Sequence, residues 1–452
     1  MTTREKAGLH ESEPNHEKLA IYGGTPVRTE PLPLEFPGIH HMDEQEIEAV
    51  AGVLRDRSPF RYYGVKLRNE VEQFEREFAT QLGLPYAVAV SSGTGALHTA
   101  LSALGIGPGQ EVIVPAYMWV AVVSAVVNLG AIPVLADIND TFGIDPDDLL
   151  QHITTRTKGI IVVHMSGAQA DVVRLAKIAR DRRLFLLEDC AQANGASING
   201  QKLGTFGDMA IFSFQMNKNM TAGEGGCVAT RDKRLYQRTV ACHDLGYARN
   251  EDGRLIFDDP DLSLWGRGYR LDELRGAVLR VQLKKMPSII ERMRTSKYRI
   301  RQALEKLPGV KLRRIVDSAG DTGAFLITTY QNAALAQRVN EALRGEGITT
   351  YPQGVSNIRM TDWGLHLYYN IVSLVFRRAV DAGGFPWNLS ENAGAETRYQ
   401  KGTCPNADDL FERSIIMSIP SCLSPKDEND IVHAFQKVLL HDFGQDGPAN
   451  TN

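Results

Sequence analysis

The sequence has no excess of charge of either sign. Its 452 residues include 50 Lys and Arg against 54 Asp and Glu, which gives a formal net charge of −4. Such a balance offers no electrostatic attraction to nucleic acid or to an anionic membrane. We therefore expect neither of them as a partner.

Long apolar runs are also missing. The most apolar window, residues 120–134, is interrupted by Asn128, Gly130 and Pro133, whereas a membrane-spanning helix needs about 20 apolar residues. The N-terminal stretch lacks the apolar core of a signal peptide. The five cysteines form no CxxC pair, which suits a reducing compartment. These absences predict a soluble cytoplasmic protein.

Common signatures of hydrolytic enzymes are absent as well. The sequence contains no HExxH motif, no Cys/His spacing typical of metal ligands and no Gly-x-Ser-x-Gly elbow. Metal-dependent and serine hydrolysis are therefore disfavoured, and we expect no metal site.

Short apolar runs alternate with amphipathic segments through the first two thirds of the chain. Strands are predicted at residues 86–90, 111–115, 132–138, 159–164, 184–189 and 209–214, and helices at 94–104, 118–129 and 170–181. A further helix is expected to begin near Asp43, where the first turn is rich in acids. Strands that are apolar throughout and alternate with helices predict a doubly wound α/β domain with a mostly parallel sheet.

The pattern changes after a long segment at residues 271–294, which is predicted to be helical. A strand at 325–330, a helix from about Ala333 and a C-terminal helix at 425–440 predict a smaller α+β domain. The expected division is a flexible arm at residues 1–30, a large domain at 31–290, a small domain at 291–445 and a tail at 446–452.

Polar residues follow several of the predicted strands. Ser91, Tyr117, Asp189 and Ser213 each lie at or just past the end of a different strand. Ligands of parallel sheets bind beyond the carboxyl ends of the strands, so these four residues should converge on one site.

Lys218 and Asp189 suggest the chemistry of that site. Lys218 lies in the segment that follows the strand at 209–214, and Asp189 ends the preceding strand. A lysine that can form an imine, with a carboxylate to keep a pyridine nitrogen protonated, is what pyridoxal 5′-phosphate (PLP) chemistry requires. The alternatives are a solvated surface lysine and an aspartate that caps a helix or a turn.

A phosphate-binding turn is the second component. Ser91-Ser-Gly-Thr-Gly95 follows a strand and opens a helix, so its backbone N–H groups could receive an anion. Ser213 could add a hydroxyl to the same phosphate. An ordinary strand-to-helix turn and an ordinary strand end would also explain these residues.

Two further side chains could enclose a cofactor ring. Trp119 begins the helix after the strand at 111–115, where it could stack on the ring, although core packing is the commoner fate of tryptophan. Gln192 could lie over the other face. His98 and His164 are expected to satisfy local hydrogen bonds, because a lysine that moves the proton makes a histidine base unnecessary.

Taken together, these segments resemble the DegT/DnrJ/EryC1/StrS family of PLP-dependent sugar aminotransferases, which has the fold of aspartate aminotransferase, PLP fold type I. The resemblance covers the chain from about Gly38 to Leu440. The segments that carry it lie at residues 91–98, 105–115, 188–196, 204–208, 213–226 and 268–273.

The resemblance implies a role for each candidate residue. Lys218 would bind the cofactor through a Schiff base, and Asp189 would pair with the pyridine nitrogen. Gln192 and Trp119 would contact the ring. The phosphate would be held by residues of the turn and strand end: Gly93, Thr94, Gly95 and Ser213. The family forms homodimers with shared active sites, so Arg270 is a candidate for contact with the partner's phosphate.

Two positions depart from the family's usual pattern. Gly268 replaces the asparagine that relatives use to reach the partner's phosphate, which weakens the assignment of Arg270. Asn194 stands where many relatives have histidine, which bears on substrate choice. Sugar dehydratases of this family replace the lysine with histidine, so Lys218 favours amino transfer.

The expected reaction moves an amino group from glutamate or glutamine to a keto sugar or keto cyclitol, in amino sugar or aminocyclitol biosynthesis for an antibiotic or a polysaccharide. Gln215 and Trp119 favour the branch that acts on inososes or on free or phosphorylated keto sugars. Dehydration, decarboxylation and aldol-type cleavage by a PLP enzyme remain alternatives, as does a PLP-binding sensor without turnover.

The acceptor itself is not identified by any motif. We expect its pocket to be lined by the Gly-, Asn- and Pro-rich loop at residues 383–404, by Arg61-Tyr-Tyr-Gly64 and by the partner subunit. Arg61 or Arg249 could meet a phosphate or a carboxylate, and each could equally be a surface residue.

Overall fold

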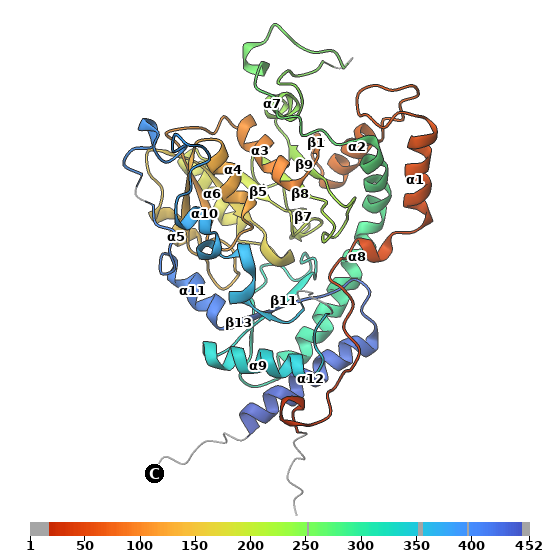
Figure 1. Ribbon diagram of the computed structural model, residues 1–452, viewed down its shortest axis with the longest axis vertical. Helices are drawn as coiled ribbons and strands as arrows, with labels where there is room; N and C mark the ends of the chain where they lie inside the picture. The colour runs from red at the N-terminus through yellow and green to blue at the C-terminus, as the bar shows by residue number, and fades with distance from the viewer. Residues whose placement is uncertain (1–17, 251–252, 351–355, 396, 445–452) are drawn as a thin grey trace, which may run out of the picture.

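The computed structural model describes residues 18–250, 253–350, 356–395 and 397–444. The chain builds a seven-stranded sheet and a four-stranded sheet, which a long helix connects (Figure 1). We call the seven-stranded sheet with its helices the large lobe. The four-stranded sheet, with the two helices beneath it in Figure 1, is the small lobe.

The large sheet has the strand order β1-β9-β8-β5-β4-β2-β3. Its strands are β1 (Tyr86–Val90), β2 (Glu111–Pro115), β3 (Ile132–Ala136), β4 (Thr157–Val163), β5 (Phe185–Asp189), β8 (Met209–Ser213) and β9 (Gly226–Thr230). Only β9 runs against its neighbours in this sheet. The predicted α/β class with a mostly parallel sheet is confirmed. The reversed strand β9 was not among the predicted strands.

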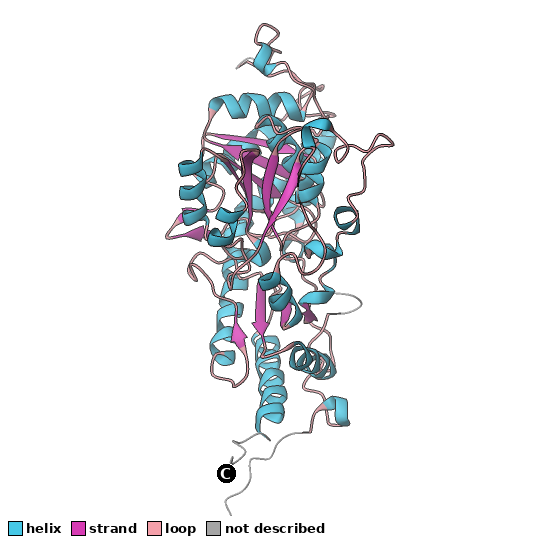
Figure 2. Cartoon of the chain, turned by 90° about the vertical axis from the view of Figure 1, so that its left-hand side faces the viewer, coloured by secondary structure: helices cyan, strands magenta, loops and turns pink. Residues whose placement is uncertain are grey.

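Helices cover both faces of this sheet because its strands are apolar on both sides. In β1, for example, Ala87 and Ala89 face one buried cluster while Val88 and Val90 face the other. The first cluster includes α2 (Glu70–Leu82), α6 (Val172–Arg182) and α8 (Glu273–Leu304), and the second includes α3 (Gly93–Ala103), α4 (Ala121–Asn128) and α7 (Lys233–His243). Figure 2 shows the strands enclosed between these helices.

The helix starts follow local capping chemistry. Helix α1 (Glu44–Arg55) begins after Asp43, whose side chain accepts from the backbone while Glu46 bonds back to the Asp43 N–H. This reciprocal arrangement confirms the predicted start near Asp43. Helix α8 begins after Asp272, which accepts a hydrogen bond from Arg275 N, and it extends ten residues beyond the predicted end at 294.

The small lobe is an antiparallel sheet with helices packed on it. Its strand order is β10-β11-β13-β12. The strands are β10 (Lys311–Leu312), β11 (Phe325–Thr329), β12 (Ile358–Arg359) and β13 (Ser414–Ser418), and its helices are α9 (Ala333–Gly345) and α12 (Pro425–Gly444). Three further short helices are α5 (Pro146–Gln151), α10 (Val372–Val375) and α11 (Pro405–Glu412), and a hairpin joins β6 (Ser197–Ile198) to β7 (Gln201–Lys202).

The segment after β12 crosses back to the large sheet. Met118 N donates to His366 O at 3.0 Å, and Tyr368 N donates to Ala116 O at 3.2 Å. This segment therefore closes over the carboxyl end of β2, where a ligand of the sheet would lie.

The predicted domain boundaries stay predictions. Residue 290 lies inside α8, which packs on α1 and α2 at one end and on α12 at the other. The described part of the expected N-terminal arm, residues 18–30, is bonded to the small lobe. Glu346 accepts from Ala20 N at 2.8 Å, and Lys437 donates to Thr25 O at 2.8 Å. The rest of that arm and the expected tail lie outside the described residues. Within the described parts, no helix has the length and apolarity needed to cross a membrane.

Candidate active site

A cavity of about 400 Å³ lies at the carboxyl ends of the parallel strands, between the two lobes. Its wall brings together most of the predicted site residues from separate elements: Gly93, Thr94, Trp119, Asp189, Gln192, Ser213 and Lys218. The strand-end rule holds for Asp189 and Ser213, whereas Ser91 and Tyr117, which were expected to converge with them, do not line the cavity. The contacts that each lining residue would make with a cofactor stay predictions.

Lys218 lies on the loop that connects β8 to β9. The loop is closed by hydrogen bonds from Phe214 N to Gly225 O and from Met216 N to Gly223 O, at 2.8 and 3.0 Å. Burial lowers the pKa of Lys218 from 10.5 to about 8, while the charges of Asp189 and Glu224 act in the opposite direction. A larger fraction of this amine is therefore neutral near physiological pH than for an exposed lysine.

Asp189 ends β5 and faces the same cavity. Its Oδ1 accepts a hydrogen bond from Ala191 N at 2.9 Å. Burial raises the pKa of Asp189, whereas that bond and the charge of Lys218 favour the ionised form. A cationic ring nitrogen opposite the carboxylate would favour ionisation further, as PLP chemistry requires.

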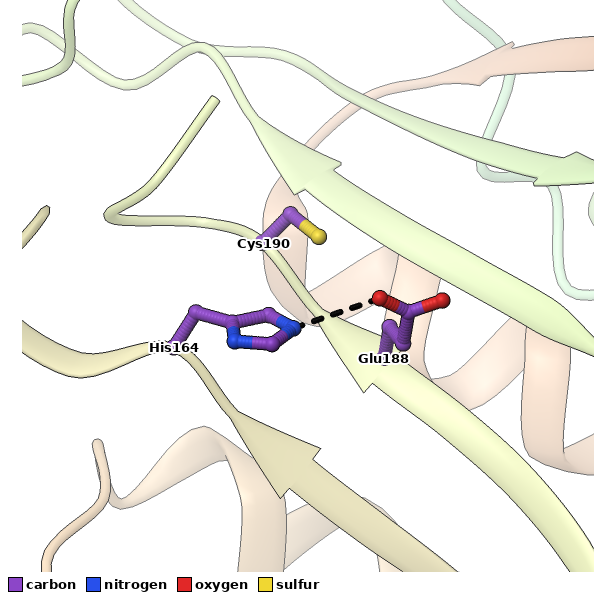
Figure 3. Close-up of side chains that lie close together, drawn as sticks. All are labelled: His164, Glu188 and Cys190. Carbon is purple, nitrogen blue, oxygen red and sulfur yellow. Dashed lines mark hydrogen bonds and ion pairs between the residues drawn. The ribbon is translucent and has the colours of Figure 1, made fainter. Parts of the chain in front are cut away.

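Glu188 and Cys190, the chain neighbours of Asp189, form a buried group with His164, which Figure 3 shows. His164 Nδ1 accepts from Ala170 N, so its Nε2 carries the proton and donates to Glu188 at 3.3 Å. The Glu188 carboxylate also accepts from the backbone N–H groups of residues 204, 206 and 207, at 2.7–2.8 Å. Burial raises the pKa of the Cys190 thiol well above its usual range.

This donor set does not resemble a metal centre. Both ring nitrogens and both carboxylate oxygens already have protein partners, and the sulfur is held as a neutral thiol, whereas metals bind thiolate. The network instead fixes the end of β5 against the loop at 204–207. The expectation that His164 satisfies local hydrogen bonds is consistent with these contacts.

The first turn of α3 and the end of β8 form a narrow cradle. Ser92 caps α3 and accepts from Gly95 N at 3.0 Å. A Cβ added to Gly93 would lie 2.8 Å from Ser213 Cβ, so only glycine leaves room for the strand and the helix to approach this closely. Free N–H groups at the helix start, beside two hydroxyls, suit a phosphate. The residues present therefore fit PLP.

Gly95 and Arg270 also lie away from the cavity of their own chain. Gly95 is not among the lining residues, and it packs beneath the ring of Tyr269. Arg270 pairs with Asp244 at 2.8 Å. The preceding residue, Tyr269, accepts a hydrogen bond from Ser91 N through its carbonyl oxygen at 2.9 Å. Arg270 was expected to serve the partner subunit, and that role stays a prediction.

Trp119 lies on the cavity wall and is not buried in the core, since 43% of its surface is exposed. Its ring lies 4.8 Å from that of His366, which stacks on Trp363 at 4.4 Å. Gln192 lies beside them, with its Nε2 3.3 Å from His366 Nε2 and its Oε1 accepting from Ser166 N at 2.9 Å.

His366 was not predicted as a site residue. Its Nδ1 donates to Trp363 O at 2.8 Å, and burial lowers the pKa of His366 to about 4, so the ring is neutral and Nε2 can accept from Gln192. The cavity is also lined by residues from parts of the chain in which the sequence showed no motif of a functional site: Glu35, Phe325, Trp363 and Ser418. The only signal available for His366 was a cluster of aromatic residues at 363–369.

The remaining candidates lie elsewhere. His98 contacts the Tyr269 hydroxyl at 3.3 Å, and the carboxamide of Asn194 is buried outside the cavity wall. Among described residues, neither the loop at 383–404 nor residues 61–64 line this cavity. Asn392 anchors that loop to Gly109 and Gly130 instead.

Arg61 and Arg249 lie near one another at the edge of β1. Arg61 forms a buried pair with Glu75 at 2.8 Å. Arg249 pairs with Asp244 at 2.8 Å and lies over the ring of Tyr62. Neither reaches the cavity of its own chain.

Comparison with known proteins agrees with this geometry. The model of the DegT/DnrJ/EryC1/StrS aminotransferase family matches residues 40–359. The 3-amino-5-hydroxybenzoate synthase of Amycolatopsis mediterranei is 38% identical over 382 residues, which is 83% of this chain and 90% of that protein. The L-glutamine:2-deoxy-scyllo-inosose aminotransferase of Streptomyces kanamyceticus is 39% identical over 282 residues, 59% of this chain and 62% of that protein.

Solved structures give the same result. The crystal structure of 3-amino-5-hydroxybenzoic acid synthase superposes with a TM-score of 0.72 and 28% identity, covering 92% of this chain and all of that one. The DesV structure from S. venezuelae gives a TM-score of 0.70 and 27% identity, covering 90% of this chain and 98% of that one. This chain therefore belongs to the DegT/DnrJ/EryC1/StrS aminotransferase family and is a PLP-dependent transaminase.

Proposed function

We propose that the protein moves an amino group from glutamine or glutamate to the keto group of a keto sugar or keto cyclitol. The single observation that carries the proposal is that Lys218 and Asp189 face one cavity at the carboxyl edge of the sheet, in a chain of this family. The product would be an amino sugar or an aminocyclitol, for an antibiotic or a polysaccharide.

The cofactor-binding roles follow from the positions of the side chains. The start of α3, Thr94 and Ser213 would hold the phosphate, and Trp119 and Gln192 would enclose the ring. When bound, PLP would supply an electron sink that allows a proton to leave the carbon next to nitrogen.

The chain's own groups would then do the following. Lys218, with a pKa of about 8, takes that proton as a neutral amine and returns it as an ammonium. Asp189 stays anionic and holds the proton on the ring nitrogen. The network of His164 and Glu188 keeps the end of β5 fixed while the substrates exchange.

An uncharged acceptor ring suits the cavity wall. Apart from Lys218 and Asp189, the ionisable side chains that line it are Glu35, Glu224 and the neutral His366. Within the described part of this chain, no arginine lines the cavity to receive a diphosphate. Aromatic side chains on one wall suit the C–H face of a cyclitol or sugar. Inosose substrates, as in the name of the Streptomyces kanamyceticus relative, meet this description.

A homodimer is part of the proposal. The segment after α7 projects from the large lobe at the top of Figure 1, and it exposes Leu245, Phe257 and Trp265, the last to 94%. A second copy that covered these side chains would bury apolar surface and bring Arg270 towards the partner's cavity. We also propose that the protein works in the cytoplasm, in line with its free cysteines.

The test uses the purified protein with bound PLP. Glutamine or glutamate should bleach the visible band of the bound cofactor, and a keto cyclitol should restore it with release of a new amine that mass spectrometry detects. Failure of every amino donor to bleach the band would refute amino transfer. Products without a new amine would point to dehydration, decarboxylation or aldol cleavage instead.

A subunit-mixing experiment tests the dimer. Lys218→Ala protein, mixed with Arg270→Ala protein, should regain activity if each site needs Lys218 from one chain and Arg270 from the other. Light scattering should give twice the 49.9 kDa chain mass. A monomeric, active enzyme would overturn this part of the proposal.

A further inference from the structure

A strained turn lies next to the cavity. Residues Met165–Gly167 follow β4, and Ser166 and Gly167 both have left-handed backbone conformations, with φ of 54° and 76°. Such conformations are unfavourable for a serine and persist only when the surroundings hold them. All three residues are buried, and Met165 lines the cavity.

The small lobe holds this turn at both ends. Arg313, which follows β10, donates from Nη1 to Met165 O at 2.8 Å. Thr322, which precedes β11, donates from Oγ1 to Gly167 O at 2.9 Å and from its backbone N–H to the same oxygen at 3.1 Å. The two carbonyls that flank Ser166 are therefore bound by groups of the other lobe.

Arg313 is buried without an anionic partner. Only 5% of its surface is exposed, and its Nε donates to Thr141 O at 2.7 Å. Among described residues, no carboxylate lies within ion-pair distance of it, and the nearby Asp321 is taken by Lys297. Its guanidinium also lies 5.8 Å from the centre of the Phe142 ring. Burying a guanidinium against carbonyl groups and a ring, without a carboxylate, is costly, so a role in stability explains it poorly.

The Met165–Gly167 turn in turn binds the side chain of Gln192. Ser166 N donates to Gln192 Oε1 at 2.9 Å, and the Ser166 hydroxyl lies 2.8 Å from the buried Tyr117 hydroxyl. With its oxygen bound there, the Gln192 carboxamide must direct its NH₂ group the other way, towards His366. The orientation of Gln192 thus depends on a turn that the small lobe holds.

We propose that Arg313 is a positioning residue. It holds the Met165–Gly167 turn so that Gln192 presents its carboxamide to the cofactor ring in one orientation. The inference rests on the proposed role of Gln192 at the ring, and it assigns to the small lobe a direct influence on how the cofactor is held.

A double-mutant cycle tests the proposal. Arg313→Met keeps the length and apolar volume of the side chain but removes its donors. We expect it to lower kcat/KM by about 10- to 100-fold, since small misplacements in an active site have effects of this size. The dissociation constant of PLP from the apoprotein, measured by fluorescence, should rise about three- to tenfold. In a Gln192→Ala background, the same change should alter either quantity by less than about twofold.

Controls separate positioning from folding. Arg314→Met removes a neighbouring arginine that makes an exposed pair with Asp140, and it should change neither quantity by more than about twofold. Arg313→Lys keeps the positive charge but not the planar set of N–H donors. We therefore expect its kcat/KM and PLP affinity to be close to those of Arg313→Met. If Arg313→Met fails to fold, Thr322→Val in the same cycle removes one donor to Gly167 O, with an expected loss of about fivefold.

The outcomes distinguish the two proposals. Equal effects of the arginine or threonine change with and without Gln192 would overturn the positioning role, even in an active enzyme. If PLP does not bind covalently to wild-type protein, the proposed function fails, whatever the cycle shows.

Discussion

The two sides of the cavity are built in different ways. The side formed by the large sheet takes Asp189 and Ser213 directly from the ends of β5 and β8, and Lys218 from the loop between β8 and β9. The opposite side takes Trp363 and His366 from irregular backbone after β12. The groups proposed to perform the chemistry thus lie at strand ends or on a loop between two paired strands, and the groups proposed to meet the acceptor lie on irregular backbone. This arrangement allows one reaction to serve many acceptors.

The largest effect should come from Lys218. Lys218→Ala removes both the point of attachment and the base, so transamination should fall by about 10²–10⁴-fold or more. After borohydride treatment, peptide mapping should find phosphopyridoxyl mass on Lys218 of the wild type and none in the variant. Lys284→Ala, at an exposed lysine of α8, should behave as the wild type. Labelling of another residue in the wild type would show that the large-sheet side of the cavity does not provide the point of attachment.

The pH dependence of cofactor uptake should report the low pKa of Lys218. Only the neutral amine reacts, so the rate at which apoprotein binds PLP should rise about tenfold per pH unit below pH 8 and level off above it. Asp189→Asn removes a charge that raises this pKa, so its midpoint should fall further. Stopped-flow absorbance measures both profiles. A midpoint near 10.5 would contradict the buried environment described for Lys218.

Gly93 should reveal how tightly the phosphate cradle is packed. Gly93→Ala places a Cβ 2.8 Å from Ser213 Cβ, and overpacking of this kind costs about 1–3 kcal/mol. The dissociation constant of PLP should therefore rise about tenfold or more. Gly107→Ala, whose Cβ would meet only Leu129 O at 3.9 Å, is the matched control. Equal PLP affinity in the two variants would argue against the cradle.

The smallest effects should come from the opposite side. His366→Ala removes a ring that packs on Trp119 and Trp363, a contact worth about 0.5–1.5 kcal/mol. We expect the acceptor's KM to rise about 2- to 13-fold, with a smaller change in the PLP dissociation constant. Steady-state kinetics with a keto cyclitol measures the first quantity. If the variant instead lost PLP and kept its KM for the acceptor, His366 would serve the cofactor. The proposal that this side of the cavity meets the acceptor would then be wrong.

Sequence patterns predicted the large-sheet side well for a physical reason. Strands such as β1 and β2 are buried on both faces, so they appear as uninterrupted apolar runs, and their predicted bounds match the structure. Once strand ends are known, topology places Asp189 and Ser213 at one edge. Strand β9 follows directly from a glycine-rich loop, and nothing in Gly-Cys-Val-Ala-Thr shows that it runs in the opposite direction.

The opposite side could not be predicted in this way. His366 lies among short 3₁₀ turns, and its position depends on distant hydrogen bonds to Met118 and Gln192. The role of Arg313 depends on a tertiary contact with Met165, about 150 residues away, for which the sequence has no local signal. Helix α8 was predicted too short: the polar residues Thr295, Ser296 and Lys297 follow position 294, yet the helix continues to Leu304 because Ile300 and Leu304 pack into the apolar cluster.

That same helix has a consequence for how the molecule loses its structure. At 32 residues, α8 is about 48 Å long, and its buried leucine, isoleucine and methionine side chains belong to one apolar cluster that continues into both lobes. Neither lobe can unfold without exposing part of the apolar surface of α8. Calorimetry should therefore record one cooperative endotherm for the whole protein, and heat should not release a folded half.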